Sequence, residues 1–238
     1  MGVIEIGAGV GVLTRELSKT AEKVIVIEID EGLKPILAET LEDCPNVEII
    51  WGDALKADLN AIIAEKLAGL EVSVCANLPY YITSPVIMRL LEERLPLKSI
   101  TVMVQKEAAE RLCALPGTRE CGAVSVAVRY YSKPKKLFEV SRGSFLPAPK
   151  VDSAVIRLDI RGETQNDVTD EKLFFKIVKA AFSQRRKQLA NPVSAELGLS
   201  KETIKTALSD CGLKPEARAE ELTLENFIKF YQYIKAVL

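Results

Sequence analysis

Four residues at the end of an apolar run, Asn77, Leu78, Pro79 and Tyr80, combine hydrogen-bond acceptors with an aromatic ring. The Asn77 side-chain oxygen and the Leu78 carbonyl are neutral acceptors, and Pro79 fixes the turn without adding a donor. Such acceptors suit methyl transfer from a sulfonium cofactor to the exocyclic nitrogen of adenine, because they favour the positive charge that develops on this poor nucleophile. Tyr80 offers a ring face to a base taken out of its stack. A plain strand-to-helix turn is the alternative, and it leaves Asn77 and Tyr80 without a role.

The composition limits the other chemistry that this chain can perform. There is no histidine, and the five cysteines include no Cys-x-x-Cys pair. Ser-His-Asp and Cys-His catalysis are therefore excluded, and neither a metal site nor a disulfide framework is expected. A reaction that needs no strong base fits such a chain.

Three glycines, Gly7, Gly9 and Gly11, follow the first apolar run in VIEIGAGVGVLTREL. They let the backbone turn tightly and approach a ligand closely. Their spacing differs from the Gly-x-Gly-x-x-Gly pattern of dinucleotide sites, which disfavours NAD. Glu28 ends the next run and could accept both ribose hydroxyls of an adenosine. Asp53 ends the third and could accept from the adenine amine, or could serve only as a helix cap or turn residue.

Short β-branched runs alternate with amphipathic segments in the first half of the chain, which predicts parallel strands joined by crossover helices. The expected strands are Val3–Ile6, Val24–Glu28, Val47–Trp51, Val72–Ala76 and Ser99–Val104. The expected helices are Leu13–Lys19, Glu31–Leu41, Asn60–Leu67, Ser84–Glu93 and Lys106–Cys113. This rhythm predicts an α/β, doubly wound, Rossmann-like sheet with its ligand site at the carboxyl ends of the strands.

The rhythm changes in the second half. Ala123–Tyr131 fits a helix or a strand, whereas Lys136–Val140 and Val151–Ile160 are expected to pair as antiparallel strands across a proline-rich turn. Beyond a polar stretch near Gly162–Asp167 the pattern is purely helical. We therefore predict a cofactor-binding domain over residues 1–164 and a small helical domain over 165–238.

The charges balance overall but not along the chain. The 238 residues carry a net charge of -1, yet residues 129–161 hold eight Lys and Arg against three acids, and Arg185-Arg186-Lys187 follows. This local excess fits a phosphate backbone as partner, although a solvated charged face would look the same. No apolar run reaches the roughly 20 residues of a membrane span, so we expect a cytoplasmic protein without a membrane partner.

Six motifs in this order resemble the ribosomal RNA adenine N6-dimethyltransferase family: EIGAGVGVLT, VIEID, GDAL, NLPYYITSPV, VMVQKEAAERL and FLPAPKVDSAVIRL. The resemblance extends over essentially the whole chain, including the helical tail with AFSQRRKQL. It implies a class I methyltransferase sheet, mostly parallel with an antiparallel final strand, and S-adenosyl-L-methionine as cofactor. It implies as substrate two adjacent adenosines, each dimethylated, in a hairpin loop near the 3′ end of 16S rRNA in the 30S subunit. We expect the protein to act as a monomer.

The resemblance also assigns residues. Gly7, Glu28, Asp53 and Asn77 match the family's cofactor-contacting positions, with Gly9 in the same turn, and Asn77 to Tyr80 match its catalytic motif. Phe145 matches an aromatic that is expected to hold the target base opposite Tyr80. From the residues alone, Phe145 could equally belong to the core.

Members of the family normally carry a few tens of residues before the first strand, including a QNFL-like stretch that helps to cover the cofactor. Here Met1-Gly2 runs directly into the expected strand. A cofactor pocket without this cover should shield the reaction poorly, so we expect reduced or absent turnover by this chain.

Other functions fit parts of the pattern. Within enzymes, the alternatives are methylation of 23S rRNA of the macrolide-resistance type, of DNA adenine, or of a protein glutamine amide. A ribosome-assembly factor that binds immature 30S subunits with little or no catalysis is the alternative outside enzymes. The NAD-dehydrogenase interpretation of the glycine turn is disfavoured by its spacing.

Overall fold

The computed structural model describes residues 1–162, 167–184 and 187–238. Two compact units are distinguished by their internal contacts, one formed by residues 1–109 with 133–162 and the other by 110–132 with 163–238. The predicted domain boundary, between residues 164 and 165, falls outside the described residues and stays a prediction. No helix among the described residues is both long and apolar enough to span a membrane.

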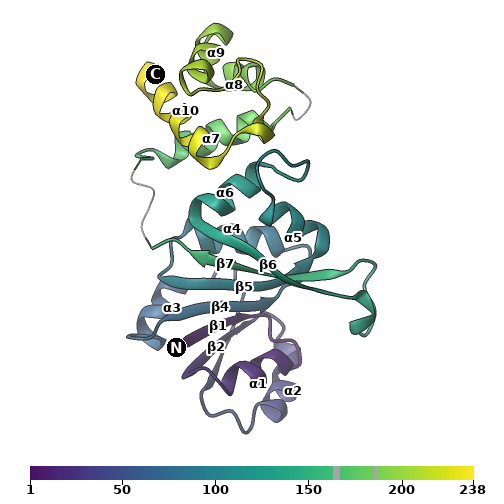
Figure 1. Cartoon of the computed structure of the whole chain (residues 1–238). Coiled ribbons are helices and arrows are strands. Elements are labelled where there is room, and N and C mark those ends of the chain that lie inside the picture. The colour runs from purple at the N-terminus through teal and green to yellow at the C-terminus, as the bar shows by residue number, and fades with distance from the viewer. Residues whose placement is uncertain (163–166, 185–186) are drawn as a thin grey trace. The chain divides into compact units, whose positions relative to one another are not determined.

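The first unit is built on a seven-stranded sheet in the order β3-β2-β1-β4-β5-β7-β6 (Figure 1). Its strands are β1 (Gly2–Ile6), β2 (Lys23–Glu28), β3 (Val47–Trp51), β4 (Val72–Asn77), β5 (Leu97–Gln105), β6 (Ser132–Val140) and β7 (Ser153–Ile160). β1 to β5 pair in parallel, and β7 pairs antiparallel with β5. The predicted mostly parallel sheet with an antiparallel addition is confirmed.

The strand order reverses at β1, where the chain first builds outward through β2 and β3 and then returns to add β4 and β5 on the other side. In open α/β sheets, ligands bind outside the carboxyl ends of the strands at such a reversal. The loops after β1 and β4 therefore lie where the fold predicts a site.

Both faces of the central strands are buried, which explains their nearly continuous apolar sequences. On one face Val3, Val24 and Val26 pack with Leu37 and Leu41. The alternate residues of the same strands face the other way and are also almost inaccessible to solvent. A charged residue in such a strand is therefore an exception with a cost.

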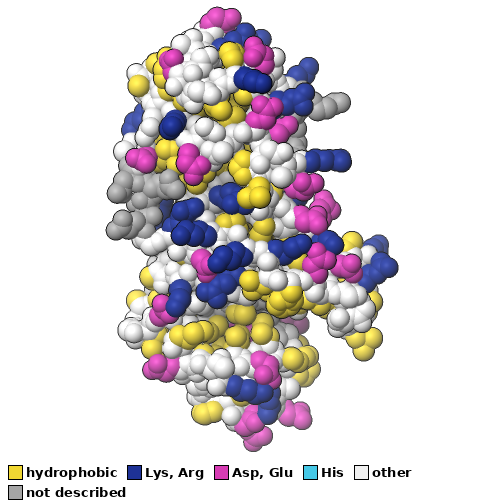
Figure 2. Space-filling view, in the orientation of Figure 1, with side chains coloured by type: hydrophobic (Ala, Val, Ile, Leu, Met, Phe, Trp, Pro, Cys, Tyr) yellow, Lys and Arg dark blue, Asp and Glu magenta, His cyan; other side chains and the backbone are white. Residues whose placement is uncertain are grey.

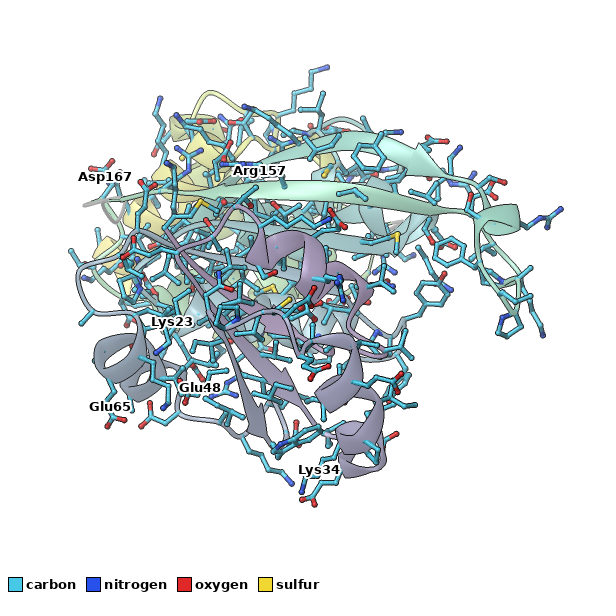
Figure 3. The ribbon with its side chains drawn as sticks, turned by 90° about the horizontal axis from the view of Figure 1, so that it is seen from below. Lys23, Lys34, Glu48, Glu65, Arg157 and Asp167 are labelled. Carbon is cyan, nitrogen blue, oxygen red and sulfur yellow. The ribbon has the colours of Figure 1, made fainter. Side chains whose placement is uncertain are left out.

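The crossover helices are α1 (Val12–Ser18), α2 (Lys34–Thr40), α3 (Leu59–Lys66), α4 (Thr83–Glu92) and α5 (Lys106–Cys113). The helix expected over Glu31–Leu41 divides into a 3-10 turn, Glu31–Leu33, and α2. Pro35 stands in the first turn of α2, where a missing N–H costs nothing. Away from the site, β2 and β3 are tied near their amino ends by an ion pair between Lys23 and Glu48, 3.3 Å apart (Figure 3).

β6 and β7 are neighbours in the sheet, as the sequence predicts, and together they project beyond the other strands (Figures 1 and 3). β6 begins at Ser132, earlier than expected, and includes Pro134. Proline lacks the N–H that a central strand needs, and β6 tolerates it because it lies at the edge of the sheet. The turn between the strands contains a short 3-10 helix, Arg142–Ser144, followed by Phe145.

The second unit is helical in its described part, with α6 (Ala123–Tyr131), α7 (Glu171–Phe182), α8 (Ala190–Leu197), α9 (Lys201–Asp210) and α10 (Leu224–Val237). The ambiguous segment Ala123–Tyr131 is thus a helix. Its Tyr130 packs on Phe174 with ring centroids 5.1 Å apart, and its hydroxyl donates to Glu171 at 2.9 Å. α9 begins after Ser200, whose hydroxyl accepts a hydrogen bond from the Thr203 N–H at 3.0 Å.

Candidate active site

The parallel register brings the predicted site residues to one edge of the sheet. Glu5 in β1 lies opposite Cys75 in β4, so Gly7 and Asn77, two residues further along each strand, leave the sheet side by side. Glu28 ends β2 on the other side of β1. The glycine turn therefore lies between a carboxylate and an amide.

The backbone of the glycine turn is open to a ligand. Gly7 and Gly9 have φ of +76° and +57°, and a Cβ atom at either position would have no heavy atom within 4 Å. The Gly7 N–H donates to the Ile27 carbonyl at 2.9 Å, which anchors the turn to β2. Glycine is required here by the left-handed backbone, and the space around it lets another molecule approach the main chain.

Glu28 closes the turn from the side of β2. Its carboxylate is buried, with 5% of the residue exposed, and accepts from the Gly9 N–H at 3.3 Å and from the Asp30 N–H at 2.9 Å. A carboxylate has about four lone-pair positions, so two remain for hydroxyl donors. The geometry fits the predicted role of Glu28 toward a ribose.

Asp53 lies two residues beyond Trp51, the residue of β3 that pairs with Glu28. One of its oxygens accepts from the Leu55 N–H at 2.8 Å, and the other lies 3.7 Å from the Lys56 ammonium. The hydrogen bond from the Leu55 N–H shows that Asp53 serves as a turn residue, which is one of the two roles that its sequence position allowed. The side chain also keeps acceptor capacity, and its predicted contact with an adenine amine stays a prediction.

The acceptors after β4 are free, whereas the turn that carries them is fixed. In the described part of the chain, neither the Asn77 side chain nor the Leu78 carbonyl takes part in a hydrogen bond. The next carbonyl, that of Pro79, accepts from the Ile82 N–H at 3.1 Å and from the Thr83 hydroxyl at 3.2 Å. The Leu78 side chain is buried and packs the turn against the core. Two unpaired acceptors thus stand on a rigid turn.

Two predicted aromatic residues come from different loops. Tyr80 is 37% exposed, and its hydroxyl lies 3.0 Å from the hydroxyl of Ser153. Phe145 is half-buried and lies outside the cores of the described residues, which leaves it available to a ligand. No ring contact joins Phe145 to Tyr80 within the described ranges. That Tyr80 and Phe145 hold a target base between them stays a prediction.

Glu5, a carboxyl group in the middle of the sheet, was not identified from the sequence. Glu5 is 1% exposed, and neither of its oxygens has a hydrogen-bond partner among the described residues. Burial raises the pKa of Glu5 to about 7. The negative charge of Glu28 also raises this pKa, whereas the nearby Thr14 hydroxyl lowers it. An acid within an expected central strand was the available signal.

Cys75, on the neighbouring strand, shares this environment. Burial and the charge of Glu5 raise the pKa of its thiol to about 11, which makes it unreactive at neutral pH. No group of three or more metal-ligating side chains forms among the residues that the structure describes.

Basic side chains gather on the visible face over the outer strands of the sheet (Figure 2). Much of this charge is paired: Arg157 and Lys135 share Asp159, at 2.6 and 3.5 Å. Lys133 and Lys150 are exposed and form no ion pair with another described residue. In the second predicted cluster, Arg185 and Arg186 lie outside the described residues.

Comparisons with known proteins identify relatives over the full length. The family model described as ribosomal RNA adenine dimethylase matches residues 1–236. A protein of Alkaliphilus oremlandii named ribosomal RNA small subunit methyltransferase A is 49% identical, covering 94% of this chain and 79% of the relative. The protein of the same name from Geobacillus thermodenitrificans is 50% identical, covering 95% and 78%.

Solved structures agree. A dimethyladenosine transferase from Plasmodium falciparum is similar with a TM-score of 0.79 at 28% identity, covering 96% of this chain and 88% of that one. The 23S rRNA methyltransferase ErmE has a TM-score of 0.75 at 25% identity, covering 99% and 91%.

Proposed function

Because the chain belongs to the ribosomal RNA adenine dimethylase family, we propose that it dimethylates N6 of two adjacent adenosines in the 3′-terminal hairpin loop of 16S rRNA. The chain is an rRNA adenine dimethyltransferase, as its family membership establishes. The choice of 16S rRNA is supported by relatives at 49% and 50% identity that are named small subunit methyltransferases. The 23S rRNA enzyme ErmE is more distant, at 25%.

One observation carries the proposal: the Asn77 side chain and the Leu78 carbonyl are unpaired acceptors on a turn whose Pro79 carbonyl accepts two hydrogen bonds. Both can accept from the N–H groups of an adenine amine, which concentrates the nitrogen lone pair and stabilises the positive charge that develops there. Neither acceptor is basic enough to take a proton. The amine proton leaves to water once the nitrogen has become cationic, and the reaction needs no histidine.

We assign the cofactor S-adenosyl-L-methionine to the edge formed by the glycine turn, Glu28 and Asp53. When bound, it supplies an electrophilic methyl group on a sulfonium. Gly7 and Gly9 would let the cofactor approach the main chain closely. Glu28 would accept hydrogen bonds from the ribose hydroxyls of the cofactor, and Asp53 would accept one from the amine of its adenine ring. The unpaired, buried Glu5 carboxyl fits a cationic cofactor, since a positive charge near it would favour its ionised form.

Tyr80 and Phe145 receive the target base. A half-exposed ring offers a stacking face that tolerates any base, and base-to-ring stacking is worth about 1–3 kcal/mol per base. The hydrogen-bond acceptors of the turn then select an exocyclic amine. Preference for a base that carries such an amine thus follows from Asn77 and Leu78, and the rings supply binding.

The substrate sets the partner and the compartment. We propose that the protein acts as a monomer on the 30S subunit, in the cytoplasm where these subunits are assembled. The exposed Lys133 and Lys150 would contact the phosphate backbone of the rRNA. No metal ion has a role in this mechanism.

Methyl transfer to undermethylated 30S subunits tests the proposal. Subunits from a strain that lacks the two dimethyladenosines are incubated with the protein and labelled S-adenosyl-L-methionine, and the 16S rRNA is digested and analysed for N6,N6-dimethyladenosine. Any label that the protein transfers should lie on 16S rRNA, at both adenosines. Asn77→Ala should reduce the rate by at least about 100-fold, because an acceptor that acts at the reacting nitrogen is lost.

Asn60→Ala is the matched control, since Asn60 is an exposed asparagine in the first turn of α3. It should methylate like the wild type. Label on 23S rRNA in place of 16S rRNA would favour the macrolide-resistance type of activity. Normal 30S binding without transfer by the unchanged protein would favour an assembly factor.

A further inference from the structure

A hydroxyl–hydroxyl contact links the turn after β4 to the start of β7. The Tyr80 hydroxyl lies 3.0 Å from the Ser153 hydroxyl, across a sequence separation of 73 residues. Ser153 is completely buried, whereas Tyr80 is 37% exposed. The contact therefore fixes the hydroxyl end of a side chain that remains partly exposed.

Ser153 occupies a defined place in the fold. It is the first residue of β7 and lies opposite Gln105, the last residue of β5, in the antiparallel register. On a strand that is paired along its length, the Ser153 backbone cannot shift without disturbing the sheet. The hydroxyl is thus presented from a rigid element.

The residue before Ser153 anchors the loop that carries Phe145. The Asp152 carbonyl accepts from the Lys106 N–H at 3.0 Å, and its carboxylate accepts from the Arg142 N–H at 2.9 Å. Asp152 and Ser153 therefore tie two loops to one point of the sheet: Asp152 holds the Phe145 loop and Ser153 holds Tyr80.

We propose that Ser153 is a positioning residue for methyl transfer, which sets the orientation of the Tyr80 ring and its register with the Phe145 loop. Ser153 touches neither the base nor the cofactor and acts through the tyrosine hydroxyl. The inference rests on the proposed role of Tyr80 as a platform for the target base. A ring held at its far end keeps one orientation, and a small displacement of a reacting group is costly in rate.

Removal of either hydroxyl tests the proposal. Ser153→Ala and Tyr80→Phe should each lower the single-turnover rate of methyl transfer to 30S subunits by about 3- to 10-fold, the factor expected for one net hydrogen bond. The KM for S-adenosyl-L-methionine should stay unchanged. The double variant should be no slower than the slower single variant, because both changes remove the same contact.

The chain offers a matched control in the same sheet. The Ser73 and Ser99 hydroxyls lie 3.1 Å apart on β4 and β5, and Ser99 is buried. Ser99→Ala removes a similar hydroxyl pair without touching Tyr80, and it should leave the rate unchanged. The melting temperatures of the Ser99 and Ser153 variants should be close to each other.

The outcomes separate the two proposals. Wild-type rates for Tyr80→Phe would overturn the role of Ser153, even if Ser153→Ala failed to fold. Losses that multiply in the double variant would overturn it as well. If Tyr80→Ala methylates normally, the platform role of Tyr80 in the proposed function fails, and the role of Ser153 fails with it.

Discussion

The buried Glu5 carboxyl makes the sheet sensitive to pH. Burial raises the pKa of Glu5 to about 7, from 4.5 in the unfolded chain. Between these values the folded state binds a proton that the unfolded state does not, so the free energy of unfolding falls as pH rises from about 4.5 to about 7 and is level above. The shift corresponds to about 3 kcal/mol.

Glu5→Gln should remove this dependence, because the amide has the same shape and cannot ionise. We expect the variant to be more stable than the wild type by roughly 1–3 kcal/mol at pH 8 and little changed at pH 5. Urea unfolding of the cofactor-free wild type and variant at both pH values measures this difference in stability. Trp51, the only tryptophan, lies in β3 and reports on the sheet. The absence of histidine removes imidazole titrations from this range.

Glu48→Gln is the control for this experiment. Hydrogen bonding to Lys66 lowers the pKa of Glu48, so its contribution is lost only in acid, below the range compared. A Glu5→Gln profile with the same slope as the wild type would contradict the assignment.

Site residues could be predicted from the sequence where they belong to a short, recognisable motif. Glycines after a strand and an acid at the next strand end are visible in a short stretch, and the structure brings Gly7, Glu28 and Asn77 to one edge. Glu5 and Ser153 were missed because their significance depends on burial and on a partner far along the chain. No local pattern specifies either property.

At the level of elements, Gly11 and Gly9 differ in what surrounds them. Gly11 has φ +86°, and a Cβ atom there would lie 3.0 Å from the Thr40 hydroxyl oxygen and 3.1 Å from Leu37. It therefore marks a close approach of α1 to α2. Gly9 needs glycine only for its φ of +57°, since nothing lies near it.

Gly11→Ala should lower the free energy of unfolding by about 2–4 kcal/mol, through strain and crowding together. Gly9→Ala should cost only about 1–2 kcal/mol, the strain of a left-handed alanine. It should nonetheless weaken cofactor binding more, because its methyl group enters the open space beside the turn. Urea unfolding and titration calorimetry measure the two effects. Equal losses of stability in the two variants would contradict the conclusion that Gly11 is needed for helix packing and Gly9 for cofactor binding.

Element prediction succeeded where periodicity and boundary residues agreed. The five parallel strands are the example. It was ambiguous for Ala123–Tyr131, whose mixture of β-branched and aromatic residues fits either state. That segment is a helix because Tyr130 and Tyr131 pack on Phe174 and Phe175, contacts that only the folded chain provides.

At the level of the whole molecule, net charge conceals a locally basic surface. The chain has a net charge of -1, yet its outer strands present Lys and Arg side chains on one face (Figure 2). Glu139 is held by two of these cations: hydrogen bonds from Lys106 and Lys136 lower its pKa to about 2. Acids of this surface are thus neutralised by neighbours, and the sequence count alone could not separate paired from available charge.

Lys133 and Lys150 should therefore account for part of the salt dependence of rRNA binding. Each phosphate contact contributes about 0.7 to 0.9 to the slope of log K against log salt concentration. The double variant Lys133→Gln, Lys150→Gln should reduce the slope for a 16S rRNA hairpin by about 1.4 to 1.8. Lys176→Gln with Lys205→Gln makes the same change in charge at lysines that pair with Glu196 and Glu202. Filter binding over a range of KCl concentrations measures both. An equal reduction in the control pair would mean that total charge, and not this surface, attracts the RNA.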